Sequence, residues 1–315
     1  MAKFKFEGQQ IAYTEYGGGP AALTESGARG RTARSSPARS RPIILVHGLL
    51  LSQLMHQRLA EDLAARGNRV ITVDLLGHGE SDRPRDMWRY SMHFFAEQVV
   101  ALMDHLGIEQ AVVMGTSLGA NTALEMALDH PERLRGMVIE MPVLDNALLW
   151  SALAFTPVLV ALTFGERAMK LLSRATRAVP RGVLPHYGNV ALDLVRQEPG
   201  PGGALLQGLF FGRIAPHRTQ RREFQTPALI LGHHRDPVHP FSDAGQLADE
   251  LPNGRLIEAN SFFELRAQPE RLTNEIAKFL DEVWATPKAR AAKTRKAPAK
   301  RKRAAAKPAK AASRR

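Results

Sequence analysis

Short, continuous apolar runs alternate with helical stretches along most of this chain, and this alternation constrains the fold more than any other feature. Six runs are typical of strands buried on both faces: PIILVHG, RVITVDLLG, QAVVMG, LRGMVIEM, TPALILG and GRLIEA. Helical periodicity occupies residues 53–66, 91–107, 118–130 and 269–284. The pattern predicts an α/β fold, with a mostly parallel sheet, right-handed crossovers and helices on both faces.

A stretch of biased composition interrupts the first part of the chain. Residues 3–15 alternate in polarity and predict a β-hairpin within residues 1–16. Residues 17–41 are rich in Gly, Ala, Ser and Arg and have no apolar period, which indicates a flexible insertion. We expect the core of the fold to occupy residues 42–141 and to resume at residues 226–286.

Residues 142–225 break the alternation, because they are apolar and helical with no clear strand. They include ALLWSALAFTPVLVALTFG, 19 residues without a charge, which by length is a marginal candidate for a membrane span. Ser151, Thr156, Pro157 and Thr163 dilute its apolar character, and no second span is evident. We therefore expect a helical cap over the ends of the strands, with an apolar inner face, and no membrane partner. A contact with a membrane surface is the alternative.

The positive charge of the chain is concentrated at its end. The formal net charge is +12, but residues 287–315 hold 13 Lys/Arg and no Asp/Glu. The rest has 30 basic and 31 acidic residues, a net charge of −1. Mutual repulsion and the lack of large apolar residues predict a disordered tail. Such a tail could contact nucleic acid or another polyanion nonspecifically, although it has no aromatic residue for base stacking.

Cysteine is absent, which excludes disulfides, thiolate metal sites and a cysteine nucleophile. The first residues, MAKFKFEGQQIAYTEY, lack the apolar segment of a signal peptide. We expect a cytoplasmic protein that uses neither a cofactor nor a metal.

The strongest chemical signal is VVMGTSLGA, which contains Gly115-Thr116-Ser117-Leu118-Gly119. A Gly-x-Ser-x-Gly motif between an apolar strand and a helical stretch is typical of a nucleophile elbow, a sharp turn that exposes the serine above the sheet. The glycines leave room for the turn, and the N-terminus of the following helix favours developing negative charge. Ser117 is therefore the predicted nucleophile or substrate anchor.

With this motif, and with LVHGLL and DLLGHGESD before it, the chain resembles the α/β-hydrolase superfamily over most of residues 3–284. The resemblance implies an α/β-hydrolase fold and an oxyanion hole formed by the backbone N–H groups of Leu49 and Leu118. It assigns Asp236, in ALILGHHRDPVHP, as the acid of a catalytic triad. The weaker alternatives, after the fourth strand, are Glu140 and Asp145.

The same resemblance reveals a missing base. In the family the last motif reads roughly Gly-His before a proline, but NSFFELRAQPERL, anchored on Pro269, places Ser261 and Phe262 there. The last histidine of the chain is His239, so we expect the ordinary Ser…Asp…His order to be excluded. If another histidine substitutes, His239 is the best placed, because it follows Asp236 by three residues and could fold back.

A serine hydroxyl is a weak nucleophile without a neighbouring base, so the sequence leaves the function open. One hypothesis is a hydrolase that acts on a small apolar ester-like or related carbonyl substrate with an atypical, incomplete triad. A second is a non-hydrolytic or catalytically weak ligand-binding member of the fold. A third adds the tail and makes the fold a module of a nucleic-acid-associated protein.

Overall fold

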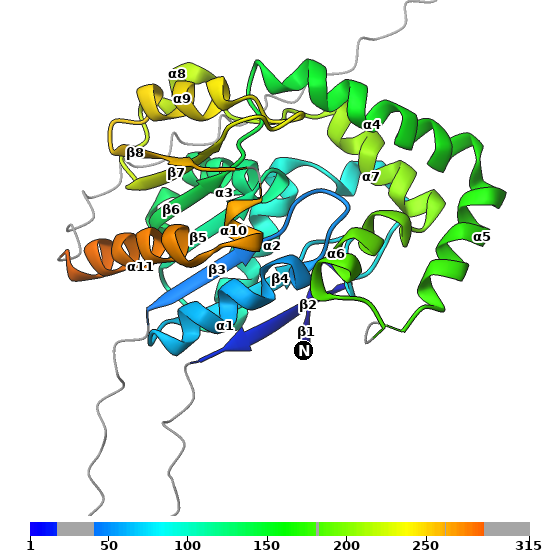
Figure 1. The fold of residues 1–315 in the computed structure, drawn as a ribbon, viewed down its shortest axis with the longest axis horizontal. Coiled ribbons are helices and arrows are strands. Elements are labelled where there is room, and N and C mark those ends of the chain that lie inside the picture. Colours follow the sequence, from blue (N-terminus) through cyan, green and yellow to red (C-terminus); the bar gives the residue numbers. More distant parts are fainter. Residues whose placement is uncertain (18–40, 181–182, 262, 287–315) are drawn as a thin grey trace, which may run out of the picture.

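An eight-stranded sheet forms the centre of the computed structural model, which describes residues 1–17, 41–180, 183–261 and 263–286 (Figure 1). The order of the strands is β1-β2-β4-β3-β5-β6-β7-β8. In chain order they are β1 (Ala2–Phe6), β2 (Gln9–Tyr16), β3 (Pro42–Val46), β4 (Arg69–Asp74), β5 (Ala111–Thr116), β6 (Leu134–Glu140), β7 (Ala228–His233) and β8 (Gly254–Ala259). The pairs β1–β2 and β2–β4 are antiparallel and the later pairs are parallel, which confirms the predicted mostly parallel sheet.

Helices connect the parallel strands and cover the sheet. In chain order they are α1 (Gln57–Ala65), α2 (Met92–His105), α3 (Leu118–Asp129), α4 (Ala147–Phe164), α5 (Glu166–Arg177), α6 (His186–Val195), α7 (Pro199–Phe211), α8 (Arg218–Arg221), α9 (Phe241–Glu250), α10 (Glu264–Ala267) and α11 (Glu270–Ala285). The four helical stretches predicted from periodicity correspond to α1, α2, α3 and α11, the first preceded by a 3-10 turn at Gln53–His56. The predicted insertion and tail lie outside the described residues, apart from Gly17 and Arg41.

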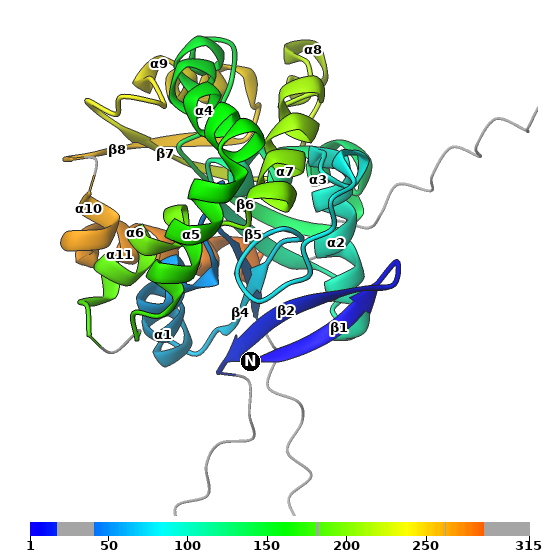
Figure 2. The same ribbon diagram turned by 90° about the vertical axis from the view of Figure 1, so that its right-hand side faces the viewer.

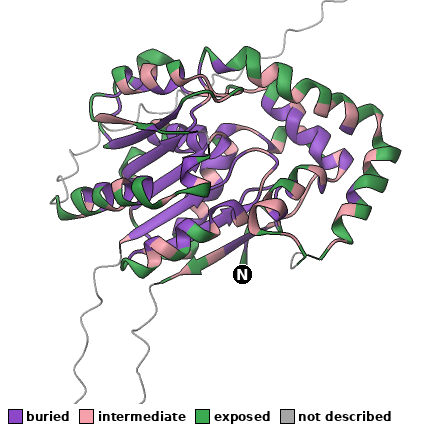
Figure 3. Cartoon of the chain, in the orientation of Figure 1, coloured by how far each residue is buried: buried purple, intermediate pink, exposed green. Residues whose placement is uncertain are grey.

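Two apolar clusters fill the space on either side of the sheet. Side chains alternate along β3, so Ile44 and Val46 join the cluster built with α2, α3 and α9. Ile43 and Leu45 join the cluster built with α1 and α11. Figure 2 shows these helices on the two faces, and Figure 3 shows the buried strands between them. Burial on both faces is the reason that β3 is a continuous apolar run.

The segment from α4 to α8 follows β6, and its described residues contain no strand, as the sequence predicts. Its start is held to the core by Asp243 of α9, whose carboxylate accepts hydrogen bonds from the N–H groups of Leu144 (2.7 Å) and Ala147 (3.0 Å). On the other side, the Ser52 hydroxyl donates to the Asp193 carboxylate of α6. Among the described residues, α4 is the one helix that is both long enough and apolar enough to cross a membrane, judged by length and composition.

Candidate active site

Ser117 stands at the sharp turn between β5 and α3, with φ 54° and ψ −107°. A positive φ is strained for a residue with a Cβ atom, and such strain is concentrated at functional sites. The turn also brings backbones together: a Cβ at Gly115 would lie 1.9 Å from the carbonyl carbon of Gly119. A Cβ at Gly119 would lie 2.2 Å from the carbonyl oxygen of Val46. Both glycines of the motif are therefore required by packing.

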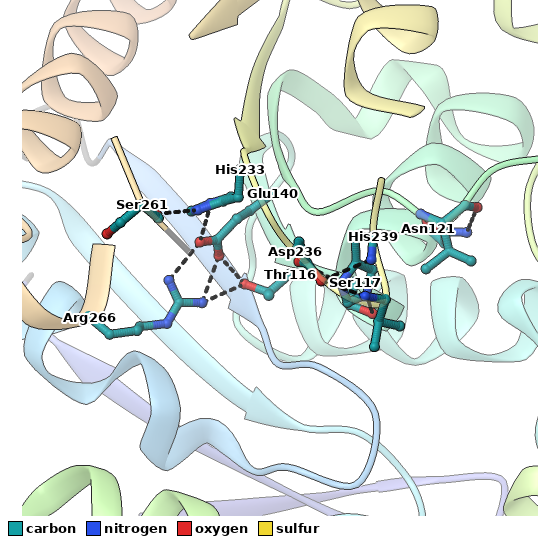
Figure 4. A network of polar contacts seen from close by, with 11 residues as sticks. Thr116, Ser117, Asn121, Glu140, His233, Asp236, His239, Ser261 and Arg266 are labelled. Carbon is teal, nitrogen blue, oxygen red and sulfur yellow. Dashed lines mark hydrogen bonds and ion pairs between the residues drawn. The ribbon is translucent and has the colours of Figure 1, made fainter. Parts of the chain in front are cut away.

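A histidine lies beside this serine. The Nε2 atom of His239 is 2.9 Å from Ser117 Oγ, and its Nδ1 atom is 2.9 Å from Asp236 Oδ2 (Figure 4). Asp236 and His239 both belong to the loop between β7 and α9. The sequence indicates a missing base and gives His239 as the best-placed substitute, and the structure brings this histidine to Ser117. The expected exclusion of the Ser…Asp…His order is wrong, because Ser117, Asp236 and His239 follow one another in that order.

The loop folds back on itself because one carboxylate collects several donors. Oδ1 of Asp236 accepts hydrogen bonds from the N–H groups of Val238 (2.8 Å) and His239 (2.9 Å), while Oδ2 accepts one from the His239 ring. Aspartate commonly bonds the backbone two residues ahead in this way to make a turn. The side chain of Asp236 is fully buried, so this turn holds the imidazole ring in a fixed orientation.

The ionised carboxylate of Asp236 determines which ring nitrogen of His239 carries the shared proton. Burial alone would raise the pKa of Asp236, but the hydrogen bond and charge of His239, with the backbone donors, hold that pKa below its ordinary value. An ionised carboxylate only accepts hydrogen bonds, so Nδ1 of His239 carries the shared proton. In a neutral imidazole with its proton on Nδ1, the lone pair of Nε2 faces Ser117 Oγ. This arrangement is able to take a proton from the hydroxyl and later return it to a leaving group.

A second polar cluster surrounds Glu140, at the end of β6. Arg266 donates to both of its carboxylate oxygens (2.6 and 2.7 Å), the Thr116 hydroxyl donates at 2.5 Å, and His233 Nε2 lies 3.2 Å away. Burial would raise the pKa of Glu140, but Arg266 and His233 hold it well below its usual value. Burial would likewise lower the pKa of His233, but the bond to Glu140 raises it. Figure 4 shows this network beside the Ser117 triad, with Thr116 next to the serine in the chain.

The three candidate acids are therefore distinguished by their partners. Among the described residues, Asp236 is the one that contacts the histidine beside Ser117. The Glu140 carboxylate forms an ion pair with the Arg266 guanidinium. Asp145 is exposed, and its Oδ2 accepts a long hydrogen bond of 3.4 Å from Gln246.

A small apolar cavity, of about 180 Å³, opens beside Ser117. Its walls come from the core and from helices α4 and α7, and include Leu49, Leu118, Asn121, Val143, Leu148, Ala152, Phe155, Leu206, Leu209, Phe210 and Ile214. The two residues expected to supply oxyanion donors, Leu49 and Leu118, thus both border the serine. Leu118 is the first residue of α3, where backbone N–H groups have no acceptor within the helix.

Sequence reasoning missed two residues that organise the site. The Asn121 amide donates to the carbonyl oxygens of Val143 and Ile214, both at 2.8 Å, and so ties α3 to both ends of the α4–α7 segment. Its position one turn after the elbow is the signal for it in the sequence. Arg266, the partner of Glu140, lies in α10, within the stretch where the family resemblance places a histidine, and no local pattern marks it. Phe262, expected at the histidine position, lies outside the described residues.

One group of side chains outside this site offers ligand atoms for a metal. Atoms of His93, Glu125 and Asp129 lie within 4.8 Å of one another. His93 Nδ1 is already 2.8 Å from the Asp129 carboxylate, and Glu125 forms an ion pair with Arg213. The positive guanidinium at this cluster opposes a second cation, so the geometry does not favour a metal here.

Comparison with known proteins identifies the family. A family model for the alpha/beta hydrolase fold matches residues 41–261. The AB hydrolase superfamily protein YisY of Bacillus subtilis is 28% identical over 258 residues, which are 76% of this chain and 91% of that protein. The 2-hydroxymuconate semialdehyde hydrolase of Pseudomonas putida is 37% identical over 205 residues, 61% of this chain and 69% of that protein.

Solved structures agree on the fold. The enol-lactonase from Burkholderia xenovorans LB400 has a TM-score of 0.67 at 20% identity, over 89% of this chain and 99% of that chain. A thermophilic esterase from Thermogutta terrifontis has a TM-score of 0.65 at 21% identity, over 89% and 97% of the two chains. At this identity the likeness concerns the fold alone. Since the family match spans most of the sequence, including the serine turn and the Asp236 loop, the chain belongs to the α/β-hydrolase fold family.

Proposed function

We propose that this protein is a serine hydrolase with the triad Ser117, His239 and Asp236, acting on a small apolar ester-like or related carbonyl substrate. The observation that carries the proposal is the pair of 2.9 Å contacts from Ser117 Oγ to His239 and from His239 to Asp236. A triad of this kind is recognised by its geometry and not by the position of its members in the sequence. The base is thus supplied by the acid loop, in place of the turn after β8.

In the proposed reaction, Ser117 Oγ attacks the substrate carbonyl carbon while His239 Nε2 takes the hydroxyl proton. Asp236 stabilises the imidazolium that forms. The backbone N–H groups of Leu49 and Leu118 donate hydrogen bonds to the carbonyl oxygen as negative charge develops on it. His239 then protonates the leaving oxygen, and a water molecule activated by the same imidazole releases the acyl group from the serine.

The cavity supports the substrate class. A volume of about 180 Å³ with mostly apolar walls accommodates a short acyl chain or small ring, and charged groups are absent among its described lining residues. Helices α4 and α7 act as a cap over it. The Pseudomonas putida relative is named a hydrolase of 2-hydroxymuconate semialdehyde, which favours a carbonyl compound among the alternatives.

The test is labelling by a fluorophosphonate probe together with kcat/KM across a panel of short-chain esters. We expect Ser117→Ala to abolish labelling, and His239→Ala to lower kcat/KM by about 10³-fold or more, as removal of a triad base does. Phe262→His is the matched control: if His239 already serves Ser117, adding a second histidine should leave the rate within about tenfold.

Two results would contradict the proposal in different ways. A His239→Ala variant that keeps its rate, or a Phe262→His variant that gains activity by orders of magnitude, would show that His239 is not the base. No labelling and no turnover across the panel would reject hydrolysis itself. The contact between His239 and Ser117 supports hydrolysis over the non-hydrolytic alternative, which rests on a missing base. Cytoplasmic location stays a prediction.

A further inference from the structure

Helix α4 is apolar along its whole length, yet most of it is not covered by the rest of the molecule. Only 11% of Ala147–Phe164 is buried, and the buried members are Ala147 and Leu162. Four large side chains of the helix are more than half exposed: Leu149 (64%), Trp150 (51%), Leu153 (58%) and Phe164 (84%). Figure 3 shows this exposure along the outer side of α4. A contiguous apolar surface of this kind marks an interaction site.

This surface is continuous with the cavity beside Ser117. Leu148 of α4 and Phe210 of α7 line that cavity and are themselves 46% and 40% exposed. The neighbouring Phe211 is also exposed. Apolar side chains therefore extend from the outer surface of α4, over the rim, to the serine. A partner on this surface would cover the mouth of the cavity.

Helix α5 adds positive charge next to α4, from which it is separated by Gly165. Arg167, Lys170, Arg174 and Arg177 are exposed and recur every three or four residues, which places them on one face of the helix. The helix has a single acidic residue, at its first position. An exposed apolar helix flanked by a row of cations is the pattern of elements that lie in a lipid interface.

We propose that α4 and the basic face of α5 dock this protein on an anionic lipid surface, with α4 lying in the plane of the interface. A spanning orientation is not compatible with the fold, because Asp243 holds the first residues of α4 and α7 packs along the helix. In the docked orientation, an apolar molecule dissolved in the bilayer reaches the rim formed by Leu148 and Phe210. The sequence favours no membrane partner and leaves a membrane-surface contact as the alternative, because composition does not reveal which side chains of α4 are exposed.

Vesicle co-sedimentation of the full-length chain tests the docking. The first variant, Leu149→Ser/Leu153→Ser/Phe164→Ser, changes exposed residues outside the cavity lining. We expect it to lower partitioning into vesicles of phosphatidylcholine, with or without phosphatidylglycerol, by at least about tenfold. A second variant, Arg167→Gln/Arg174→Gln, should weaken binding to the vesicles that contain phosphatidylglycerol and leave binding to pure phosphatidylcholine unchanged.

The control is Phe263→Ser, which removes an equally exposed aromatic side chain (62%) outside α4 and α5 and should not affect binding. Binding to pure phosphatidylcholine vesicles at high salt measures the contribution of α4 without that of residues 287–315, because the attraction of these basic residues to vesicles is electrostatic. Ser117→Ala should bind vesicles like the parent, so failure of the docking and failure of the hydrolase proposal are distinguishable.

Three outcomes would overturn the docking. The triple serine variant could bind phosphatidylcholine as well as the parent while its thermal unfolding is unchanged. The Phe263→Ser control could lose binding to the same extent. Light scattering could show that the triple variant converts a dimer into a monomer without a change in vesicle binding, which would assign α4 to an interface between two copies of the chain.

Discussion

Replacing Arg266 should distinguish the roles of the two acids near the serine turn, because we expect Glu140 to stabilise the fold and Asp236 to support catalysis. Glu140 is fully buried and receives two hydrogen bonds from Arg266, at 2.6 and 2.7 Å. Arg266→Met removes the guanidinium and leaves a buried carboxylate. Breaking a buried ion pair on one side costs about 3–5 kcal/mol of unfolding free energy. We expect a loss near the lower end of this range, because the Thr116 hydroxyl and the His233 ring remain beside Glu140.

The double variant Glu140→Gln/Arg266→Met removes both charges and should recover much of that loss, because a buried pair is often replaceable by neutral groups. The two changes should therefore couple by about 2 kcal/mol in a double-mutant cycle. Urea unfolding followed by circular dichroism measures all four proteins. For a slope of roughly 3 kcal/mol per M, Arg266→Met should unfold at about 1 M less urea than the parent. A midpoint equal to that of the parent, or additive effects in the cycle, would refute the reasoning.

The pH dependence gives an independent check. The folded-state pKa of Glu140 lies well below its ordinary value of 4.5, so the ionised carboxylate stabilises the fold fully above pH 4.5. This stabilisation is lost as the pH falls from 4.5 through the folded-state pKa. Glu140→Gln should accordingly flatten the acid side of the stability curve. It should also keep kcat/KM within about tenfold of the parent, whereas Asp236→Asn should lower it by about 10⁴-fold.

Two further predictions concern the cavity and the end of the chain. Ala152→Phe adds a ring to a cavity of about 180 Å³, so kcat/KM should fall more steeply with acyl length than in the parent; an unchanged acyl-chain profile would place the substrate elsewhere. Deleting residues 287–315, which hold 13 Lys/Arg, should abolish any salt-sensitive binding to nucleic acid in fluorescence anisotropy, and binding retained by the shortened chain would refute a role for these residues.

Much of the fold follows from local patterns in the sequence. The run PIILV predicts a doubly buried strand, and its residues from Ile43 to Val46 alternate between the two apolar clusters. The serine turn is local at Gly115, which closely approaches Gly119 of the following helix, whereas Gly119 approaches Val46 of β3, a strand that is distant in the chain. Such features are readable because a few neighbouring residues determine them.

The proposed base was predictable only in part, since the sequence gives His239 as the best-placed substitute without determining where its ring points. The three-residue spacing between Asp236 and His239 is visible in the sequence, but only the turn made by the Asp236 carboxylate aims the ring at Ser117, 122 residues earlier. The pairing of Glu140 with Arg266 spans 126 residues and depends on how β6 lies relative to the segment after β8. The exposure of α4 is also a tertiary property, because a buried and an exposed apolar helix have the same composition.

The chain departs from the family pattern in two ways: the turn after β8 lacks the histidine, and the proposed base comes from the loop after β7. Both departures bear on what the turn after β8 contributes. In the family that turn presents the histidine, whereas here it contributes Arg266, whose guanidinium reaches Glu140 and the Thr116 hydroxyl, at 3.3 Å, next to the serine. Supplying acid and base from the single loop after β7 leaves the turn after β8 free to neutralise Glu140 at the end of β6. In the proposed triad both acid and base come from the loop after β7, so the absence of a histidine from the turn after β8 does not by itself leave Ser117 without a base.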